Sequence, residues 1–240
     1  MTDKEIYKKK IKSNIDEFGY HVTLVTSQTE PRYAYTIGLY QKFNIELVFA
    51  GGIFFMKDEI LSIFKAVINE LKSNENASKV KIKDLGTFSF TKVDRSWSKL
   101  MLLGVYDFFD IEEFNAIQIY PDEHHFTLDI PDLSRKFNPS IEKVWKWLKN
   151  DLKYPVSKKM MVVTNLDALK GVKITEIMRW EEDEFEMFAG SGDDVKKEEI
   201  RVVPFSTLLG IDETLGGVLN LKVGKGFWRG DDSNKWNNWG

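Results

Sequence analysis

The stretch YAYTIGL at residues 33–39 decides the fold of the first part of this 240-residue chain. It is rich in aromatic and β-branched residues, and this composition is typical of a β-strand. Residues 20–26 and 45–49 have a similar composition, and turn-prone residues at 30–31 and 42–44 separate the three stretches. We therefore expect three consecutive strands that pair as an antiparallel meander.

Helical periodicity occurs on both sides of these strands. Tyr7, Ile11, Ile15 and Phe18 recur every three to four residues, which places them on one helix face that ends at Gly19. The stretch 57–71 follows the pattern of an amphipathic helix. Further elements that we expect are strands at 87–93 and 116–120 and a helix from Pro139 that carries Ile141, Val144, Trp145, Leu148 and Leu152.

Length and composition indicate two folded domains. With 42% hydrophobic and 13% aromatic residues, the chain has enough apolar material for two packed cores. Beyond Pro155 the pattern changes to short strands at 160–164, 172–178, 185–189, 201–203 and 226–228, with a short helix at 213–221. We expect an α+β fold of two small domains, 1–155 and 156–240, each a mostly antiparallel sheet packed with helices.

The first part resembles a known family. The motif FGYHV at 18–22, then YAYTIGL at 33–39, then ELV at 46–48 resembles the DUF4262 family of bacterial domains of unassigned function. The likeness covers roughly the first 120 to 150 residues. It implies a fold class rather than a reaction.

The second part resembles the small bacterial immunity-protein domains known as DUF2185 or Imm33. The shared features are Arg179-Trp180, the segment FAG at 188–190, Val203-Pro204, Leu208-Leu209 and a late GFWR at 226–229. Members of that family usually carry an Asp-Ser-Gly-Trp element before the Phe-X-Gly segment, whereas this chain has EEDEF at 181–185. The resemblance implies a protein that binds a toxin.

Composition narrows the classes of protein that fit. Cysteine is absent, so disulfides, thiolate metal sites and cysteine nucleophiles are excluded. The first ten residues are strongly charged and no apolar run is long enough to span a membrane, so we expect a cytoplasmic protein that does not bind membranes. The formal net charge of -3 argues against direct nucleic-acid binding, which requires positive charge.

One short segment has the residue types of a metal site. Asp122, Glu123, His124 and His125 are consecutive, and Asp129 follows four residues later. Neighbouring histidines on a strand point to opposite faces, so they do not bind one ion without a turn. A solvated turn after Pro121 explains the segment without a ligand, and we expect no metal and no cofactor.

A second group of residues fits a ligand pocket. His21 titrates near neutral pH, and the strand that we expect beside it carries Tyr33, Tyr35 and Thr36. A structural histidine that is hydrogen-bonded to backbone or to a hydroxyl explains the same residues. No nucleophile accompanies His21, and the glycines at 51–52 and 224–226 lack the rest of a phosphate-binding motif, so we assign no catalytic residue.

The acidic stretch 176–199 is the third candidate, with ten acidic and three basic residues. It fits a solvated loop or a surface that occupies the positive cleft of a basic enzyme. On the second reading, the partner-binding residues are Trp180, Glu181, Glu182, Asp183, Glu184, Glu186, Asp193, Asp194 and Trp228. Trp236 and Trp239 near the C-terminus either dock on the body of the protein or anchor a partner.

Together these patterns predict an immunity-type protein that binds a cognate protein toxin and blocks its active site. Two alternatives remain open for the first domain. It is a small-ligand-binding or hydrolytic domain with its pocket near His21 and Tyr35, or it is a scaffold or dimerisation module without a ligand.

Overall fold

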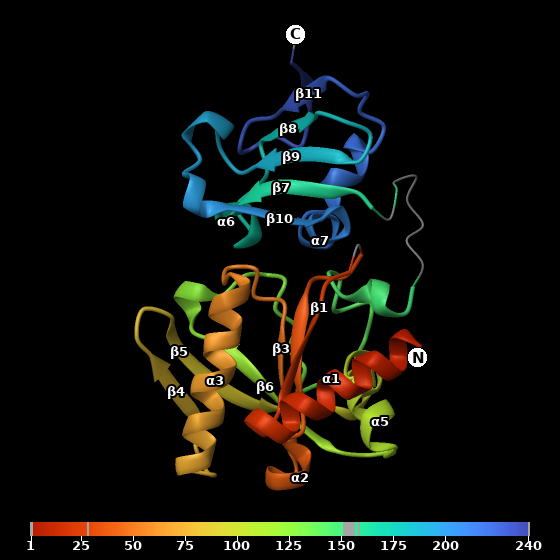
Figure 1. Cartoon of the computed structure of the whole chain (residues 1–240). Coiled ribbons are helices and arrows are strands. Elements are labelled where there is room, and N and C mark those ends of the chain that lie inside the picture. Colours follow the sequence, from red (N-terminus) through yellow and green to blue (C-terminus); the bar gives the residue numbers. More distant parts are fainter. Residues whose placement is uncertain (1, 28, 151–156, 158, 240) are drawn as a thin grey trace. The chain divides into compact units, whose positions relative to one another are not determined.

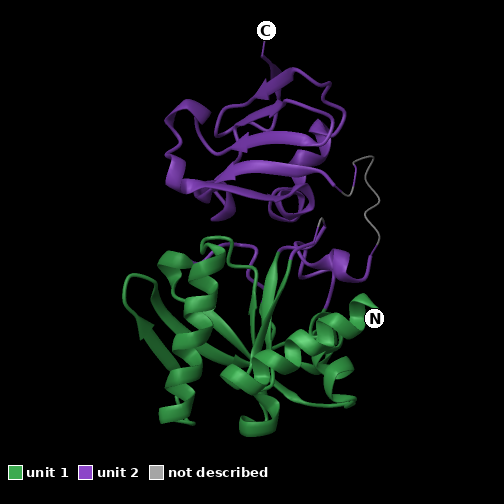
Figure 2. Cartoon of the chain, viewed as in Figure 1, with its two compact units in different colours: residues 1–25, 32–125, 132–137 green, residues 26–31, 126–131, 138–240 purple. Residues whose placement is uncertain are grey.

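A computed structural model describes residues 2–27, 29–150, 157 and 159–239 (Figure 1). The chain divides into two compact units (Figure 2). Each unit contains a six-stranded, mostly antiparallel sheet with helices, as expected for an α+β protein of two domains. Unit 1 comprises Met1–Val25, Arg32–His125 and Asp132–Phe137, and unit 2 comprises Thr26–Pro31, Phe126–Pro131 and Asn138–Gly240. The boundary that we expected at Pro155 lies outside the described residues.

The sheet of unit 1 has the strand order β1-β2-β3-β6-β5-β4. The first three strands form the expected antiparallel meander, and β3 pairs with β6 in the parallel direction. The strand β4 was not apparent from the sequence because two of its four residues are exposed lysines. The bounds are β1 His21–Val25, β2 Tyr33–Ile37, β3 Ile45–Ala50, β4 Lys79–Ile82, β5 Gly86–Lys92 and β6 Asn115–Pro121.

Helices cover both faces of this sheet. The two helices predicted on either side of the first three strands are present. They are α1 (Asp3–Phe18), which ends at the left-handed Gly19, and α3 (Lys57–Ser73). The apolar stripe of α3 packs on Leu47 and Phe49 in the main core of the unit. On the opposite face, α1 and α5 lie against β1 and β2. The remaining helices are α2 Tyr40–Phe43, α4 Arg95–Met101, α5 Leu103–Phe109 and the 3-10 turn η1 Glu123–His125.

The prediction of a helix that begins at Pro139 is wrong for the described residues 139–150. Residues 139–150 form turns, with one short 3-10 segment, η2 (Lys146–Leu148). Of the predicted apolar stripe, Val144 and Trp145 are buried, whereas Ile141 is exposed. Trp145 is held by a contact outside this segment, since its indole N–H donates to the carbonyl of Asp129 at 2.8 Å. The last residue of the predicted stripe, Leu152, lies outside the described residues.

The sheet of unit 2 has the strand order β10-β7-β9-β8-β11-β12. The neighbouring strands β7 and β9 are parallel, and the other pairs are antiparallel. All five predicted strands are present, with bounds that differ by a few residues. The bounds are β7 Met161–Asn165, β8 Glu176–Arg179, β9 Glu184–Phe188, β10 Ile200–Pro204, β11 Lys225–Trp228 and β12 Asn237–Asn238.

Helices cover one face of this second sheet. Phe205 of α7 (Phe205–Ile211) packs on Phe185 of β9 with ring centroids 5.3 Å apart. Leu128, which precedes the sheet in sequence, belongs to the same unit and donates its N–H to the carbonyl of Leu169. The other helical segments are α6 Leu166–Leu169, η3 Gly192–Asp194, η4 Lys197–Glu199 and η5 Glu213–Val218. Among the described residues, no helix has both the length and the apolar composition needed to cross a membrane.

Candidate functional site

The YAYTIGL stretch forms hydrogen bonds with a buried carboxylate, that of Glu46 in β3. Glu46 is fully buried and accepts hydrogen bonds from the Thr36 hydroxyl (2.6 Å) and from the backbone N–H groups of Gly38 (2.8 Å) and Tyr40 (3.0 Å). Burial raises the pKa of Glu46 to about 7, and the hydrogen bonds oppose this shift. The carboxylate therefore fixes the turn that leads from β2 into α2. The sequence places Glu46 in the family-like motif ELV but indicates no role for it, since it is one acid within the apolar stretch IELVFA.

Gly38 makes this turn possible because of its conformation and its surroundings. Its φ angle is +123°, which L side chains rarely adopt. A Cβ atom at this position would lie 2.9 Å from Cγ1 of Ile15 and 3.1 Å from Cα of Tyr20. Helix α1 and the residues that follow it therefore approach Gly38 closely.

His21 lies in a chain of polar side chains on the face of the sheet that α1 covers. Its Nδ1 is 2.7 Å from the Asn14 amide nitrogen, and its Nε2 is 3.5 Å from the Tyr7 hydroxyl. The Tyr7 hydroxyl is also 3.0 Å from that of Thr23. Burial and the positive charge of Lys10 lower the pKa of His21, so the imidazole is neutral at pH 7. Both ring nitrogens have partners within the protein, as expected for a structural histidine.

The structure brings together three of the four residues predicted for a ligand pocket. His21 and Tyr35 lie on the same face because Thr23, two residues from His21, pairs with Tyr35 across β1 and β2. The rings of Tyr33 and Tyr35 are stacked with centroids 6.2 Å apart, and the Tyr35 hydroxyl accepts from Gly104 N–H. Thr36 does not join them, since its hydroxyl is bonded to Glu46 and Leu47 of β3.

The Asp122–His125 segment is a turn that packs on the core of unit 1. Asp122 accepts from the Thr87 N–H at 2.7 Å and lies 2.6 Å from Nδ1 of His125. The His125 ring stacks on Phe55 with centroids 5.5 Å apart, while His124 is exposed. Over the described ranges, no group of three or more potential ligand side chains is placed to hold a metal ion. Because each carboxylate oxygen of Asp122 has a partner, Thr87 or His125, this side chain stabilises the contact between β5 and β6.

The second sheet has one face that α7 does not cover, which we call the outer face. Along β8 and β9, the apolar residues that point to the covered face are almost fully buried; they are Ile177, Phe185 and Met187. The alternate residues point to the outer face and pair across the strands as Met178 with Glu186 and Glu176 with Phe188. Exposed large side chains also occur on this face. They are Val202 of β10, Trp180 at the end of β8 and Trp228 of β11.

A groove of about 460 Å³ runs along this outer face. Trp180 and Trp239 line it together with Phe188, and Glu176, Glu186 and Asp193 supply carboxylates. The Trp180 indole N–H donates to Oε2 of Glu186 at 2.6 Å, and Glu176 accepts from the Gly192 N–H at 2.8 Å. Aromatic rings and carboxylates thus lie side by side in one groove.

The nine predicted partner-binding residues occupy different parts of unit 2. Trp180, Glu186 and Asp193 line the groove. Glu184 and Trp228 are exposed strand residues on the outer face, and Asp194 is exposed just beyond the groove. Glu181, Glu182 and Asp183 form the β8–β9 turn, where the Arg179 guanidinium donates to the carbonyls of Glu181 and Glu182. Glu176 and Phe188 were missed because only the strand register brings them to the groove.

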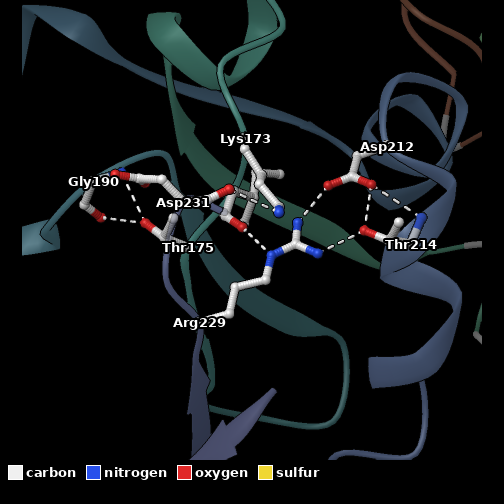
Figure 3. A network of polar contacts seen from close by, with 8 residues as sticks. Lys173, Thr175, Gly190, Asp212, Thr214, Arg229 and Asp231 are labelled. Carbon is white, nitrogen blue, oxygen red and sulfur yellow. Dashed lines mark hydrogen bonds and ion pairs between the residues drawn. The ribbon is translucent and has the colours of Figure 1, made fainter. Parts of the chain in front are cut away.

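The C-terminal segment is held on the sheet by a buried arginine (Figure 3). The Arg229 guanidinium donates to the Ile174 carbonyl (2.6 Å), the Thr214 hydroxyl (2.7 Å) and the Asp212 carboxylate (2.6 Å). It also lies 4.2 Å from the centroid of the Trp236 ring. Arg229 therefore has a structural role, and the tail docks on the sheet through β12, which places Trp239 against Gly226.

Comparisons with known proteins identify one part of the chain. Residues 14–126 match the family model DUF4262, described as a domain of unknown function, in agreement with the resemblance seen in the sequence. No curated protein and no solved structure matches the chain. The resemblance of residues 156–240 to DUF2185 or Imm33 stays a prediction.

Proposed function

We propose that this chain, whose residues 14–126 form a DUF4262 domain, is a cytoplasmic immunity-type protein that binds a cognate protein toxin and blocks its active site. In this account the outer face of unit 2 makes the contact. Unit 1 provides a stably folded domain whose motif residues are used in packing, as the buried Glu46 and Gly38 illustrate.

The observation that carries the proposal is the exposure of tryptophan beside carboxylates on the outer face. Trp180 is 53% exposed and Trp228 is 44% exposed. Tryptophan is among the residues that contribute most binding energy at protein interfaces, and an isolated soluble protein usually buries it. Neighbouring carboxylates on the same face favour a partner with a positive active-site cleft, because complementary charge accelerates association and adds specificity.

The proposal is tested by growth rescue. The protein partner recovered from the native host is expressed in a sensitive bacterium, alone and together with this protein. We expect the wild-type protein to restore growth and the Trp180→Ala variant to fail at equal abundance. The control is Val172→Ala, which shortens a side chain that is equally exposed but lies outside the groove. A partner that has no toxic effect would contradict the proposal.

A second function, small-ligand binding or hydrolysis in unit 1, is favoured by the polar chain around His21. The neutral imidazole has the chemistry of a general base, and it lies on the same face of the sheet as Tyr35. To act as a base, it would exchange its contact with Tyr7 for one with the substrate. The test is a melting-temperature screen against metabolites. A ligand-induced rise in Tm that is lost in a folded His21→Ala variant would support this function, and the absence of any such ligand would count against it.

A further inference from the structure

We infer that the groove on the outer face of unit 2 is a recognition site for an arginine side chain of the partner protein. This inference rests on the proposed function, and it specifies the chemistry by which the partner is recognised. It is based on the residues that line the groove, on the hydrogen bonds that the groove carboxylates make, and on the absence of a cationic partner for them among the described residues.

The carboxylates of the groove have no cationic partner within the part of the chain that the structure describes. Oε2 of Glu186 accepts from Trp180 and Oε2 of Glu176 accepts from Gly192, which leaves the second oxygen of each side chain without a hydrogen bond among the described residues. Asp193 is exposed and forms no ion pair there. No lysine or arginine is among the described residues that line the groove. The groove is therefore a negative site that a cation complements.

The walls of the groove favour a planar cation over a compact one. The indole rings of Trp180 and Trp239 line it, and Phe188 is a largely buried aromatic side chain within it. A guanidinium group stacks on an aromatic face and at the same time donates hydrogen bonds in its plane, whereas an ammonium group is a strongly hydrated point charge. The combination of indole faces and carboxylate edges therefore selects arginine over lysine.

Two contacts prepare the groove before any partner binds. The Trp180–Glu186 hydrogen bond limits the orientations of both side chains. Trp239 is fixed because its backbone N–H donates to the Gly226 carbonyl at 3.0 Å and its ring fills the space above Gly226. Since these side chains lose little further freedom on binding, more of the interaction energy contributes to affinity.

The test uses N-acetyl-arginine methylamide as the probe and the full chain as the protein. Binding is followed by the NMR signal of the Trp180 indole N–H, which is assigned as the signal that disappears in Trp180→Phe. We expect a saturable shift with the arginine probe, a several-fold weaker effect with the lysine analogue and no saturation with the citrulline analogue, which has the same shape but no charge. Glu186→Gln and Asp193→Asn should each weaken arginine binding, Glu186→Gln by about tenfold.

The matched control is Asp232→Asn, which removes one exposed carboxylate of unit 2 outside the groove and should leave the affinity unchanged. Equal shifts with arginine and citrulline, or equal affinities in wild type and both groove variants, would overturn the inference. Because the probe contains no toxin, the two proposals fail separately. Toxin neutralisation without arginine binding overturns the groove assignment, whereas specific arginine binding supports it even where no toxin partner exists.

Discussion

The indole N–H of Trp180 donates to Oε2 of Glu186 at 2.6 Å, so the most exposed tryptophan of the outer face is joined to a carboxylate. The two residues lie on opposite sides of the β8–β9 turn, and Glu186 pairs with Met178 across the strands. This contact brings an apolar anchor and a negative charge to one point on the outer face of unit 2. It is the structural basis for proposing that this face binds a basic protein.

Charge reversal at the β8–β9 turn should slow association with the partner. Glu182 and Glu184 are exposed, so their carboxylates act mainly by steering rather than by close contact. We expect Glu182→Lys with Glu184→Lys to lower the affinity at least about tenfold, chiefly through kon, and to reduce its dependence on salt. Surface plasmon resonance at two salt concentrations measures both effects. Unchanged affinity in this double variant would contradict the proposed interface.

Removal of the Arg229 side chain should destabilise unit 2. Arg229→Met removes the donor to the Ile174 carbonyl and to Oδ2 of Asp212, while Oδ1 of Asp212 keeps its bonds from Thr214. Because the Asp212 carboxylate is partly exposed, we expect a cost of about 2–3 kcal/mol, at or below the lower end of the range for breaking a buried ion pair. Urea unfolding measures this change. The control, Arg135→Met, removes an exposed arginine that pairs with Asp132 and should change stability by no more than about 0.5 kcal/mol. Equal effects of the two substitutions would show that Arg229 is not a structural anchor.

The stability of unit 1 should fall as the pH rises towards 8 because of Glu46. Its folded-state pKa of about 7 is above the ordinary value of 4.5, so the folded state retains a proton that the unfolded chain releases. The stabilisation is complete below pH 4.5 and is lost as the pH rises through 7, with a slope of at most about 1.4 kcal/mol per pH unit. Glu46→Gln should remove this slope, while Glu123→Gln, at an exposed position, should retain it. The readout is the free energy of unfolding between pH 5 and pH 8, and an unchanged slope in Glu46→Gln would refute this assignment.

Gly38 should tolerate substitution less well than Gly19. Gly38→Ala combines a strained backbone with overlap against Ile15 and Tyr20, and we expect a cost of about 3 kcal/mol or more. Gly19 also has a positive φ but nothing within 4 Å of the added Cβ, so Gly19→Ala should cost about 1–2 kcal/mol. Thermal unfolding of both variants compares them directly. Equal losses of stability would mean that the close packing around Gly38 contributes nothing.

Much of the fold was predictable because local periodicity agrees with tertiary packing. The helix α3 and the strands β1 to β3 have patterns that match their burial in the sheet. The segment after Pro139 has apolar residues at helical spacing, but Trp145 is buried by a contact with Asp129, which periodicity does not reveal.

The candidate site was less predictable than the fold, for a related reason. Composition indicated Trp180 and Glu186, which are close in sequence. Glu176 reaches the groove through strand register, and Trp239 reaches it because the C-terminal tail returns along β11. Contacts between residues that are distant in sequence depend on the complete fold, so no local pattern indicates them.

The most direct test of the central claim is a quantitative pull-down from the native host lysate with three forms of the tagged protein. These are the wild type, Trp180→Ala combined with Glu186→Lys, and the control Val172→Ala. The account predicts one stoichiometric protein partner, toxic when expressed alone, that the wild type and the control retain and that the double variant loses. Equal recovery of that partner by all three forms would contradict the claim that the outer face of unit 2 binds it.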